Sequence, residues 1–289
     1  MAIPILASGF LVKSGKQMLS YDGLILRNHG YINDETQAKI RATRLLVAGC
    51  GIGSSFAEAA VRLGFENITL ADGDTVAASN LNRQNFTADD IGKPKVEALA
   101  RRLRAINPAA DIQEFNAYLT PESIVDKVAK ADLVFDTIDF LDLAAIVALH
   151  DECRRQRKPA ITALAVGWGA GCIYFPVGCE YSFRRVFGLQ EEGSVEHMLY
   201  VDMFAPLIKR LENRLDSTVF KVVNNALKVM EDGTPCPASQ VSPGAFSVGA
   251  LGATLAMRIL ANLPVLAAPH LLLADMQSSL IGSGIDLSN

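Results

Sequence analysis

The chain has 289 residues, of which 50% are hydrophobic and 20% are charged, and its formal net charge is −4 at pH 7. This size and apolar content allow one large α/β domain or two small ones, while the interspersed acidic and basic residues argue against a basic surface for nucleic acid. The five cysteines are irregularly spaced, which favours a reducing cytoplasmic compartment over a disulfide framework.

Residues 1–44 are predicted to form an N-terminal helical arm. Within it, residues 30–44 have the composition of a capped helix, with Asn33 or Asp34 as the N-cap. The apolar run at the start of the chain has no basic segment before it, so we do not expect a signal peptide.

Strands alternate with helices in the predicted core, residues 45–177. Short apolar runs at 45–49, 68–72 and 131–139 predict buried strands, and residues 159–177 predict one or two more. Helical patterns occupy residues 54–64, 93–108 and 143–156. This alternation predicts an α/β fold with a doubly wound, mostly parallel sheet and helices on both faces.

Residues 178–289 are expected to complete the sheet and to add a substrate-binding cap to the same domain. Residues 181–233 read as amphipathic helical pieces, and the prolines of 234–243 predict a loop. The apolar stretch that follows, 244–261, is short of the ~20 apolar residues of a membrane span and contains Arg258. It therefore predicts a buried helix, and we expect no membrane association.

A glycine-rich stretch, LLVAGCGIGSS, joins the first predicted strand to the next helix. Gly49, Gly51 and Gly53 permit a tight turn close to a phosphate, and the helix N-terminus offers unpaired N–H groups. Asp72 follows Gly49 by 23 residues, where a carboxylate can bind ribose hydroxyls. Ser54 stands where the usual dinucleotide pattern has its third glycine. The stretch predicts a nucleotide site without specifying the nucleotide.

Further polar residues follow the later strands. Because the carboxyl ends of parallel strands meet at one crevice, we expect these residues to lie beside the glycine loop. Cationic side chains there suit a triphosphate, and an aspartate opposite them suits Mg²⁺. The residues are Asn80, Arg83, Gln84, Lys95 and Asp139.

These motifs resemble those of the ThiF/MoeB/HesA-type adenylyltransferases of the ubiquitin-activating enzyme superfamily. The matching pieces are GCGIGSS, DGDTVAASNLNRQ, IGKPK, INP and DTID, and the resemblance is strongest over residues 27–175. It implies a Rossmann-like fold and an enzyme that uses ATP and Mg²⁺. A substrate carboxylate would attack the α-phosphate, form an acyl-adenylate and release pyrophosphate. That carboxylate would be the C-terminus of a ubiquitin-like or sulfur-carrier protein, a peptide or a smaller acid.

The resemblance also implies roles for individual residues. Asp72, in a D-x-D motif with Asp74, would hold the ribose, and the glycine loop would receive the phosphates. Asp139 would help to hold Mg²⁺. Phosphate contacts and charge stabilisation would come from Asn80, Arg83, Gln84 and Lys95.

A homodimer is implied as well. Relatives often carry R-Y-x-R-Q near the N-terminus, which supplies an arginine to the partner subunit's ATP. Here the stretch is SYDGLILRNHGYI, in which Arg27 is either that trans-acting catalytic arginine or a surface arginine. Phe140 stands where an asparagine is common, so contacts to Mg²⁺ or to the substrate tail would differ.

The cysteines mark two more departures. Many relatives bind structural Zn²⁺ through two C-x-x-C pairs, whereas here Cys179 and Ser182 stand near the first pair and no second pair exists, so we expect no zinc. Cys236 lies in a proline-rich loop where relatives that transfer the acyl group often have a cysteine. It is either a catalytic nucleophile or an incidental loop thiol.

Two other functions stay open at this point. A nicotinamide-dependent oxidoreductase would share the glycine loop and Asp72, although Arg83, Gln84 and Lys95 argue against it. A catalytically reduced relative would serve as a partner-binding scaffold, in keeping with the lost N-terminal arginines.

Overall fold

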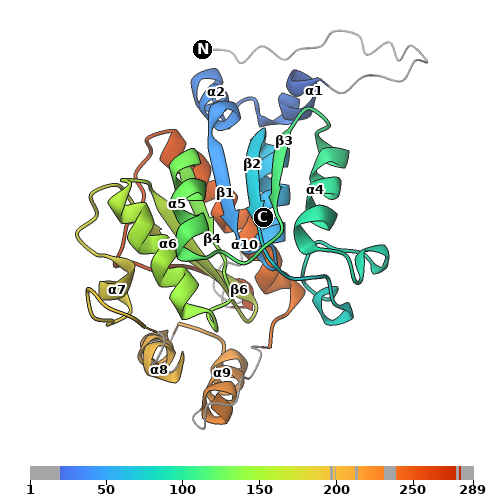
Figure 1. Ribbon diagram of the computed structural model, residues 1–289. Coiled ribbons are helices and arrows are strands. Elements are labelled where there is room, and N and C mark those ends of the chain that lie inside the picture. The colour runs from blue at the N-terminus through green and yellow to red at the C-terminus, as the bar shows by residue number, and fades with distance from the viewer. Residues whose placement is uncertain are drawn as a thin grey trace, which may run out of the picture.

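A computed structural model gives the fold of the chain (Figure 1). It describes residues 20–195, 198, 200–211, 214–230, 239–277 and 280. Cys236 and the first half of the predicted 234–243 loop, residues 234–238, lie outside these described residues.

A seven-stranded sheet forms the centre of the molecule, with strand order β3-β2-β1-β4-β5-β6-β7. The strands from β3 to β5 are parallel, and β6 and β7 add to the edge in antiparallel fashion. The chain thus winds outward in both directions from β1, which places a switch point between β1 and β4. The strands are β1 (Arg44–Ala48), β2 (Asn67–Ala71), β3 (Asp111–Phe115), β4 (Leu133–Asp136), β5 (Ala160–Val166), β6 (Gly169–Phe175) and β7 (Leu272–Asp275).

Helices cover both faces of this sheet, as the predicted α/β class requires. One face packs on α3 (Gly53–Leu63), α4 (Lys95–Ile106) and α10 (Ser242–Leu260), and the other on α5 (Pro121–Lys130) and α6 (Leu143–Arg155). Alternate residues of β1 point to opposite faces of the sheet. Leu45 and Val47 pack in the core beneath α3, α4 and α10, and Leu46 and Ala48 pack in the core beneath α5 and α6. In Figure 1, α5 and α6 lie in front of the sheet and α10 behind it.

The first described elements, α1 (Tyr21–Ile25), η1 (Leu26–Asn28) and α2 (Asp34–Ala42), lie at the end of the sheet where the parallel strands begin (Figure 1). Tyr21 Oη donates to Gly64 O over 3.1 Å, and Asn28 Nδ2 donates to Leu63 O over 3.1 Å. These bonds satisfy carbonyls at the C-terminus of α3, so the described part of the arm is attached to that end of α3.

The other end of the molecule carries α8 (Tyr200–Leu211) and α9 (Ser217–Met230), preceded by the short α7 (Phe183–Val186). Figure 1 shows α8 and α9 beyond the carboxyl ends of the parallel strands. Val219 of α9 packs in a small core with Leu164 and Val166 of β5, so α9 is anchored on that strand. The helical pieces predicted for residues 181–233 are therefore present in the described residues.

The long apolar helix α10 is a core helix of the sheet, as the sequence predicts. By length and composition alone it is the one helix of the described residues that could cross a membrane. Its small residues instead permit close packing: a Cβ on Gly249 would lie 2.6 Å from Ser55 O, and one on Gly252 would lie 2.7 Å from the Phe135 ring. Phe135 in turn stacks on Phe56, with ring centroids 3.5 Å apart.

Several predicted boundaries are confirmed, and others shift for local reasons. Asn33 caps α2 by accepting from Thr36 N, and Gly64 ends α3 at a φ of 108°. The strand predicted over 131–139 is shorter, because the backbone leaves the sheet at Thr137. Three elements were not predicted from the sequence: α5, β7 and β3, an edge strand in which Ile112 alone is buried.

The contact between α10 and α3 leads to a prediction for stability. Gly249→Val should lower the free energy of unfolding by about 2 kcal/mol or more, because the new side chain must displace the backbone at Ser55. Ala250→Val, at an exposed position of the same helix, is the matched control and should change it by less than about 0.5 kcal/mol. Urea denaturation of both variants measures the difference, and equal midpoints would contradict the packing described.

Candidate functional site

A cavity of about 430 Å³ opens at the switch point of the sheet. The register of the strands brings its walls together, because Ala48 pairs with both Ala71 and Asp136 and the three strands end level with one another. The residues that follow these strands, Gly49, Asp72 and Thr137, therefore line one side of the cavity. A crevice of this kind is where open α/β sheets bind ligands.

The glycine loop after β1 is held directly against the loop after β4. Gly49 has a φ of 86°, and a Cβ there would overlap Thr137 O. A Cβ on Gly53 would overlap Thr137 Oγ1, which donates to Gly49 O over 2.7 Å. Gly49 and Gly53 are thus required by this contact, and of the two only Gly49 lines the cavity, together with Gly51.

Asp72 orders the turn at the end of β2. Its carboxylate accepts from Cys50 N over 2.7 Å and from Asp74 N over 2.8 Å. Burial raises the pKa of Asp72 above its ordinary value, although these bonds and the nearby Lys95 oppose that shift. Asp72 also lines the cavity. That it binds ribose stays a prediction.

Lys95 and Asp74 form an ion pair at the cavity wall. Lys95 Nζ lies 2.6 Å from Asp74 Oδ2, and the Lys95 side chain is only 9% exposed. Tyr118 Oη donates to the other oxygen of Asp74 over 2.5 Å. Burial would raise the pKa of Asp74, but the bonds from Lys95 and Tyr118 outweigh it and leave that pKa below its ordinary value. The ammonium is thus held in place before any ligand arrives.

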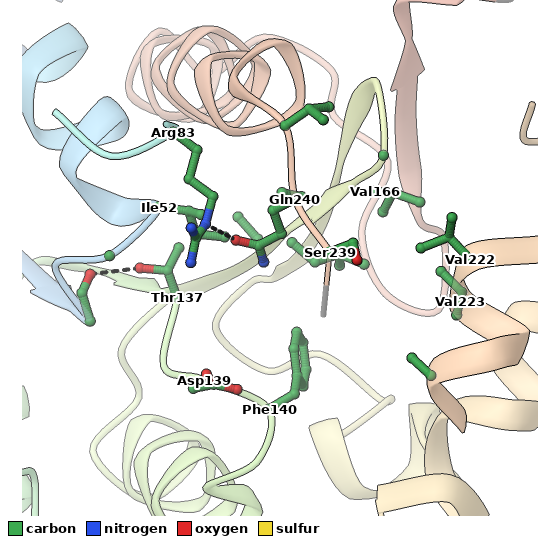
Figure 2. A pocket seen from close by; sticks show the side chains of 18 of the residues that line it. Ile52, Arg83, Thr137, Asp139, Phe140, Val166, Val222, Val223, Ser239 and Gln240 are labelled. Carbon is green, nitrogen blue, oxygen red and sulfur yellow. Dashed lines mark hydrogen bonds between the residues drawn. The ribbon is translucent and has the colours of Figure 1, made fainter. Parts of the chain in front are cut away.

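Arg83 reaches the cavity from the loop after η2 (Ala78–Asn80) and is held by neutral acceptors. Its Nε donates to Gln240 Oε1 over 2.6 Å (Figure 2). Its Nη1 donates to Ser79 O over 2.8 Å. Burial lowers the pKa of the guanidinium, and the Asp139 carboxylate opposes that shift. Within the described residues the hydrogen bonds of Arg83 go to neutral acceptors, so its charge is available to an anionic ligand.

Gln84, the next residue, is buried against the glycine loop. A Cβ on Gly51 would lie 3.3 Å from Gln84 Nε2, which places the amide directly over that glycine. Gln84 Oε1 is buried and has no hydrogen-bond partner within the described part of the chain. Because a buried acceptor without a donor is costly, this atom is suited to a donor from a ligand or water in the cavity.

A hydrogen-bond network joins this loop to α3. Asn85 N donates to Ser54 Oγ over 3.0 Å, and Ser54 Oγ donates to Gly51 O over 2.6 Å. Asn85 Nδ2 donates to Glu58 Oε2 over 2.8 Å, and Arg102 also binds that carboxylate. Ser54, which breaks the dinucleotide pattern, therefore fastens the glycine loop to the loop that carries Arg83.

Asp139 lies at the cavity across from Arg83 (Figure 2). Its side chain is exposed, and its Oδ1 accepts from Leu141 N over 3.0 Å. Among the described residues there is no group of three or more His, Cys, Asp or Glu side chains that could hold a metal alone. A single accessible carboxylate nevertheless fits Mg²⁺, which commonly takes one or two protein carboxylates with phosphate oxygens and water.

Other predicted residues lie elsewhere. Asn80 Oδ1 accepts from Ala77 N over 2.9 Å, and Asn80 is not part of the cavity wall. Arg27 lies in η1, near the C-terminal end of α3, whereas the glycine loop precedes the N-terminal end of that helix. Cys236 lies outside the described residues. Cys179, which stands near the position of the first C-x-x-C pair of zinc-binding relatives, has its Sγ 3.8 Å from Ala268 O.

The sequence indicated no role for Thr137 or Gln240, and Ser54 stood out only as a departure from the dinucleotide pattern. Thr137 lies within the DTID motif, so its position was visible although its contact with the glycine loop was not. Gln240 is 157 residues from Arg83 and follows a proline-rich stretch, so no local signal connects the two side chains.

Comparison with known proteins gives consistent matches. The ThiF family matches residues 25–281. The sulfur carrier protein ThiS adenylyltransferase of Escherichia coli K12 is 36% identical over 46% of this chain and 53% of its own length. The molybdopterin-synthase adenylyltransferase of the same organism is 31% identical over 68% of this chain and 78% of its own length. Thus the matched region spans about half of the first relative and about three quarters of the second.

The fold has solved counterparts as well. The crystal structure of E. coli MccB with ATP has a TM-score of 0.60 at 20% identity and covers 83% of this chain and 66% of that one. Similarity at this level of identity establishes a shared fold.

The network at Glu58 generates a pH prediction. Burial would raise the pKa of Glu58, but hydrogen bonds from Arg102, Asn85 and Arg62 lower it from 4.5 to about 2. Since the pKa is lower in the folded state, the carboxylate stabilises the fold above pH 4.5, and this contribution is lost as the pH falls toward 2. Glu58→Gln should therefore lose less stability than the parent chain between pH 5 and pH 3. Urea denaturation at both pH values measures this, and parallel losses would argue against it.

Proposed function

Because the chain belongs to the ThiF family, we propose that its cavity binds ATP and adenylates a substrate carboxylate. A carboxylate oxygen attacks the α-phosphorus, and the bond from that phosphorus to the bridging oxygen of the pyrophosphate breaks. The products are an acyl-adenylate and pyrophosphate, which leaves with the electrons of the broken bond. No general base is needed, since the nucleophile is already ionised at neutral pH.

The observation that carries this proposal is the convergence of two held cations on the glycine loop. Arg83 and Lys95 line the same cavity as Gly49 and Gly51, and the bonds that they donate to Gln240 and Asp74 fix them before substrate binds. Fixed positive charge at a phosphate stabilises the negative charge that develops in the transition state and on the leaving pyrophosphate. Such an arrangement suits a triphosphate better than a dinucleotide. A dinucleotide cofactor keeps its phosphates throughout its reaction, so no charge develops on a leaving phosphate.

The remaining residues of the site have supporting roles in this proposal. Asp72 and Asp74 lie where the ribose hydroxyls would bind, and Gln84 would offer its unpaired oxygen to a donor on the nucleotide or to water. Asn80 would act through the turn that it caps, by positioning Arg83. A Mg²⁺ ion held by Asp139 and phosphate oxygens would neutralise part of the triphosphate charge.

The substrate is a carboxylate, and the relatives narrow its class. Those two proteins are named as adenylyltransferases of the sulfur carrier ThiS and of molybdopterin synthase. A small carrier protein, a peptide or a small acid is therefore the proposed substrate of this chain. The comparisons give no support to the nicotinamide-dependent oxidoreductase. The scaffold alternative differs from the proposal in one measurable respect, ATP–pyrophosphate exchange.

We also propose a cytoplasmic homodimer. The four cysteines within the described residues are free thiols, in keeping with a reducing compartment. Arg27 lies at the far end of α3 from the glycine loop, and this helix of 11 residues is about 16 Å long. Arg27 would therefore serve a nucleotide bound to the partner copy.

If Cys236 takes the acyl group from the adenylate, it would do so as a thiolate, with release of AMP.

Removal of the charges at the cavity tests the proposed reaction. Arg83→Ala and Asp139→Ala should each slow ATP–pyrophosphate exchange by about 100-fold or more, because each deletes a group that stabilises or binds the triphosphate. The control is Arg155→Ala, which removes an exposed arginine paired with Glu152 outside the cavity and should leave exchange unchanged. Exchange that survives in both site variants would refute these roles, and a parent chain that dimerises but exchanges with no carboxylate would be a scaffold.

Mixing of two inactive variants tests the role of Arg27. Arg27→Ala and Arg83→Ala chains should each exchange poorly alone. A mixed dimer contains one site with both arginines intact if Arg27 acts on the partner copy, so mixing should restore exchange toward about one quarter of the parent rate. Native mass spectrometry of the mixture verifies that the mixed dimer forms. No recovery in a mixture that contains it would rule out action in trans.

A further inference from the structure

The cavity has two halves of different chemistry. Its charged residues all lie on the side of the glycine loop: among the described lining residues they are Asp72, Asp74, Arg83, Lys95 and Asp139. The opposite side is formed by the end of β5, the turn after it, and α9, and none of its described lining residues is charged. Figure 2 shows Arg83, Thr137 and Asp139 across the cavity from Val166, Val222 and Val223.

The apolar wall is formed by one stripe of α9. The residues of this stripe recur at helical spacing and all line the cavity: Val219, Val222, Val223, Ala226, Leu227 and Met230. Val219, Leu227 and Met230 are buried in the core, whereas Val222 remains 42% exposed. An apolar side chain that lines a cavity and is still exposed to solvent gains free energy when an apolar group covers it.

The position of this wall is fixed by the turn between β5 and β6. Gly167 has a φ of 56°, and a Cβ there would overlap Val219 Cγ2. A Cβ on Gly244, at the start of α10, would overlap Gly167 O. The turn is thus enclosed by α9 on one side and α10 on the other. The wall is therefore built into the fold and does not depend on a ligand.

If the nucleotide occupies the glycine loop, as proposed above, the reacting carboxylate lies between the two halves. Gln240 binds Arg83, and its neighbours Ser239 and Val241 line the cavity toward α9. Phe140 lies directly after Asp139 and packs against the core beneath α9. A carboxylate bound beside the nucleotide at this boundary would direct the rest of its acyl group onto the valines.

We propose that the substrate carboxylate belongs to a bulky apolar acyl group, which packs on the Val222–Val223 wall of α9 while the nucleotide occupies the glycine loop. This inference rests on the adenylation function proposed above. A terminal glycine would leave Val222 exposed to water. A polar or charged side chain would lose its hydration against a wall without charged partners, so the wall discriminates against both.

Stable mimics of the acyl-adenylate test this directly, because the nucleotide part anchors every mimic. We would compare acyl-sulfamoyl adenosines that carry isocaproyl, its polar isostere succinamoyl, or acetyl, by isothermal titration calorimetry. The isocaproyl mimic should bind about 10- to 100-fold more tightly than the other two. A fourth mimic with an N-acetylglycyl-leucyl group distinguishes the sources: tighter binding than isocaproyl identifies a peptide terminus, and weaker binding identifies a free acid.

Two substitutions on the same helix locate the effect. Val222→Asp should weaken binding of the isocaproyl mimic by about 10-fold or more and leave the affinity for the non-hydrolysable ATP analogue AMPPNP unchanged. Val229→Asp is the matched control, because Val229 lies on α9, is 50% exposed and does not line the cavity. It should bind every mimic as the parent chain does.

The outcomes separate this inference from the proposed function. Equal affinities for the isocaproyl and succinamoyl mimics, in a chain that binds ATP, would overturn the apolar acyl site and leave adenylation standing. Equal effects of the two valine substitutions would overturn it as well. A chain that binds neither ATP nor any mimic would refute adenylation itself.

Discussion

The site depends on one close contact between two stretches of bare backbone. The loop after β1 and the loop after β4 meet at the switch point, where no side chain fits between Gly49 and Thr137. Thr137 Oγ1 closes the contact through its hydrogen bonds to Ala48 O and Gly49 O. Since both loops leave strands that end level with each other, this contact fixes the glycine turn, the start of α3 and the path toward Asp139 together.

The charges are organised around this fixed turn. Each cation of the cavity is held by a partner from a distant part of the chain: Lys95 by Asp74, and Arg83 by Gln240. The loop that carries Arg83 is fastened to α3 through Asn85, with Ser54 and Glu58 as acceptors. Such preorganisation matters for phosphoryl chemistry, in which positioned charge supplies most of the catalysis.

Local signals in the sequence predicted the parts of the fold that depend on local physics. Asn33 and Gly64 mark helix ends because an N-cap acceptor and a left-handed C-cap have few alternatives. The alternation of strands and helices predicted the sheet, and the topological rule then brought Arg83, Lys95 and Asp139 to one cavity. Edge strand β3 was not predicted, because a strand with one buried side chain shows no alternation of apolar and polar residues. The partnership of Arg83 with Gln240 and the apolar wall of α9 also escaped, since both arise from packing between segments far apart in the chain.

Cys50 has a consequence for the chemistry that the glycine loop can undergo. It is fully buried, and burial together with the nearby Asp72 raises the pKa of its thiol well above the ordinary value. Thiols react with electrophiles and peroxides as thiolates, so a buried neutral thiol is inert toward both. The loop thus contains a cysteine beside the proposed phosphate site that does not react as an exposed thiol would. The conformation of the glycine loop is therefore protected from oxidants and alkylating agents, which would modify an exposed thiolate at the same position.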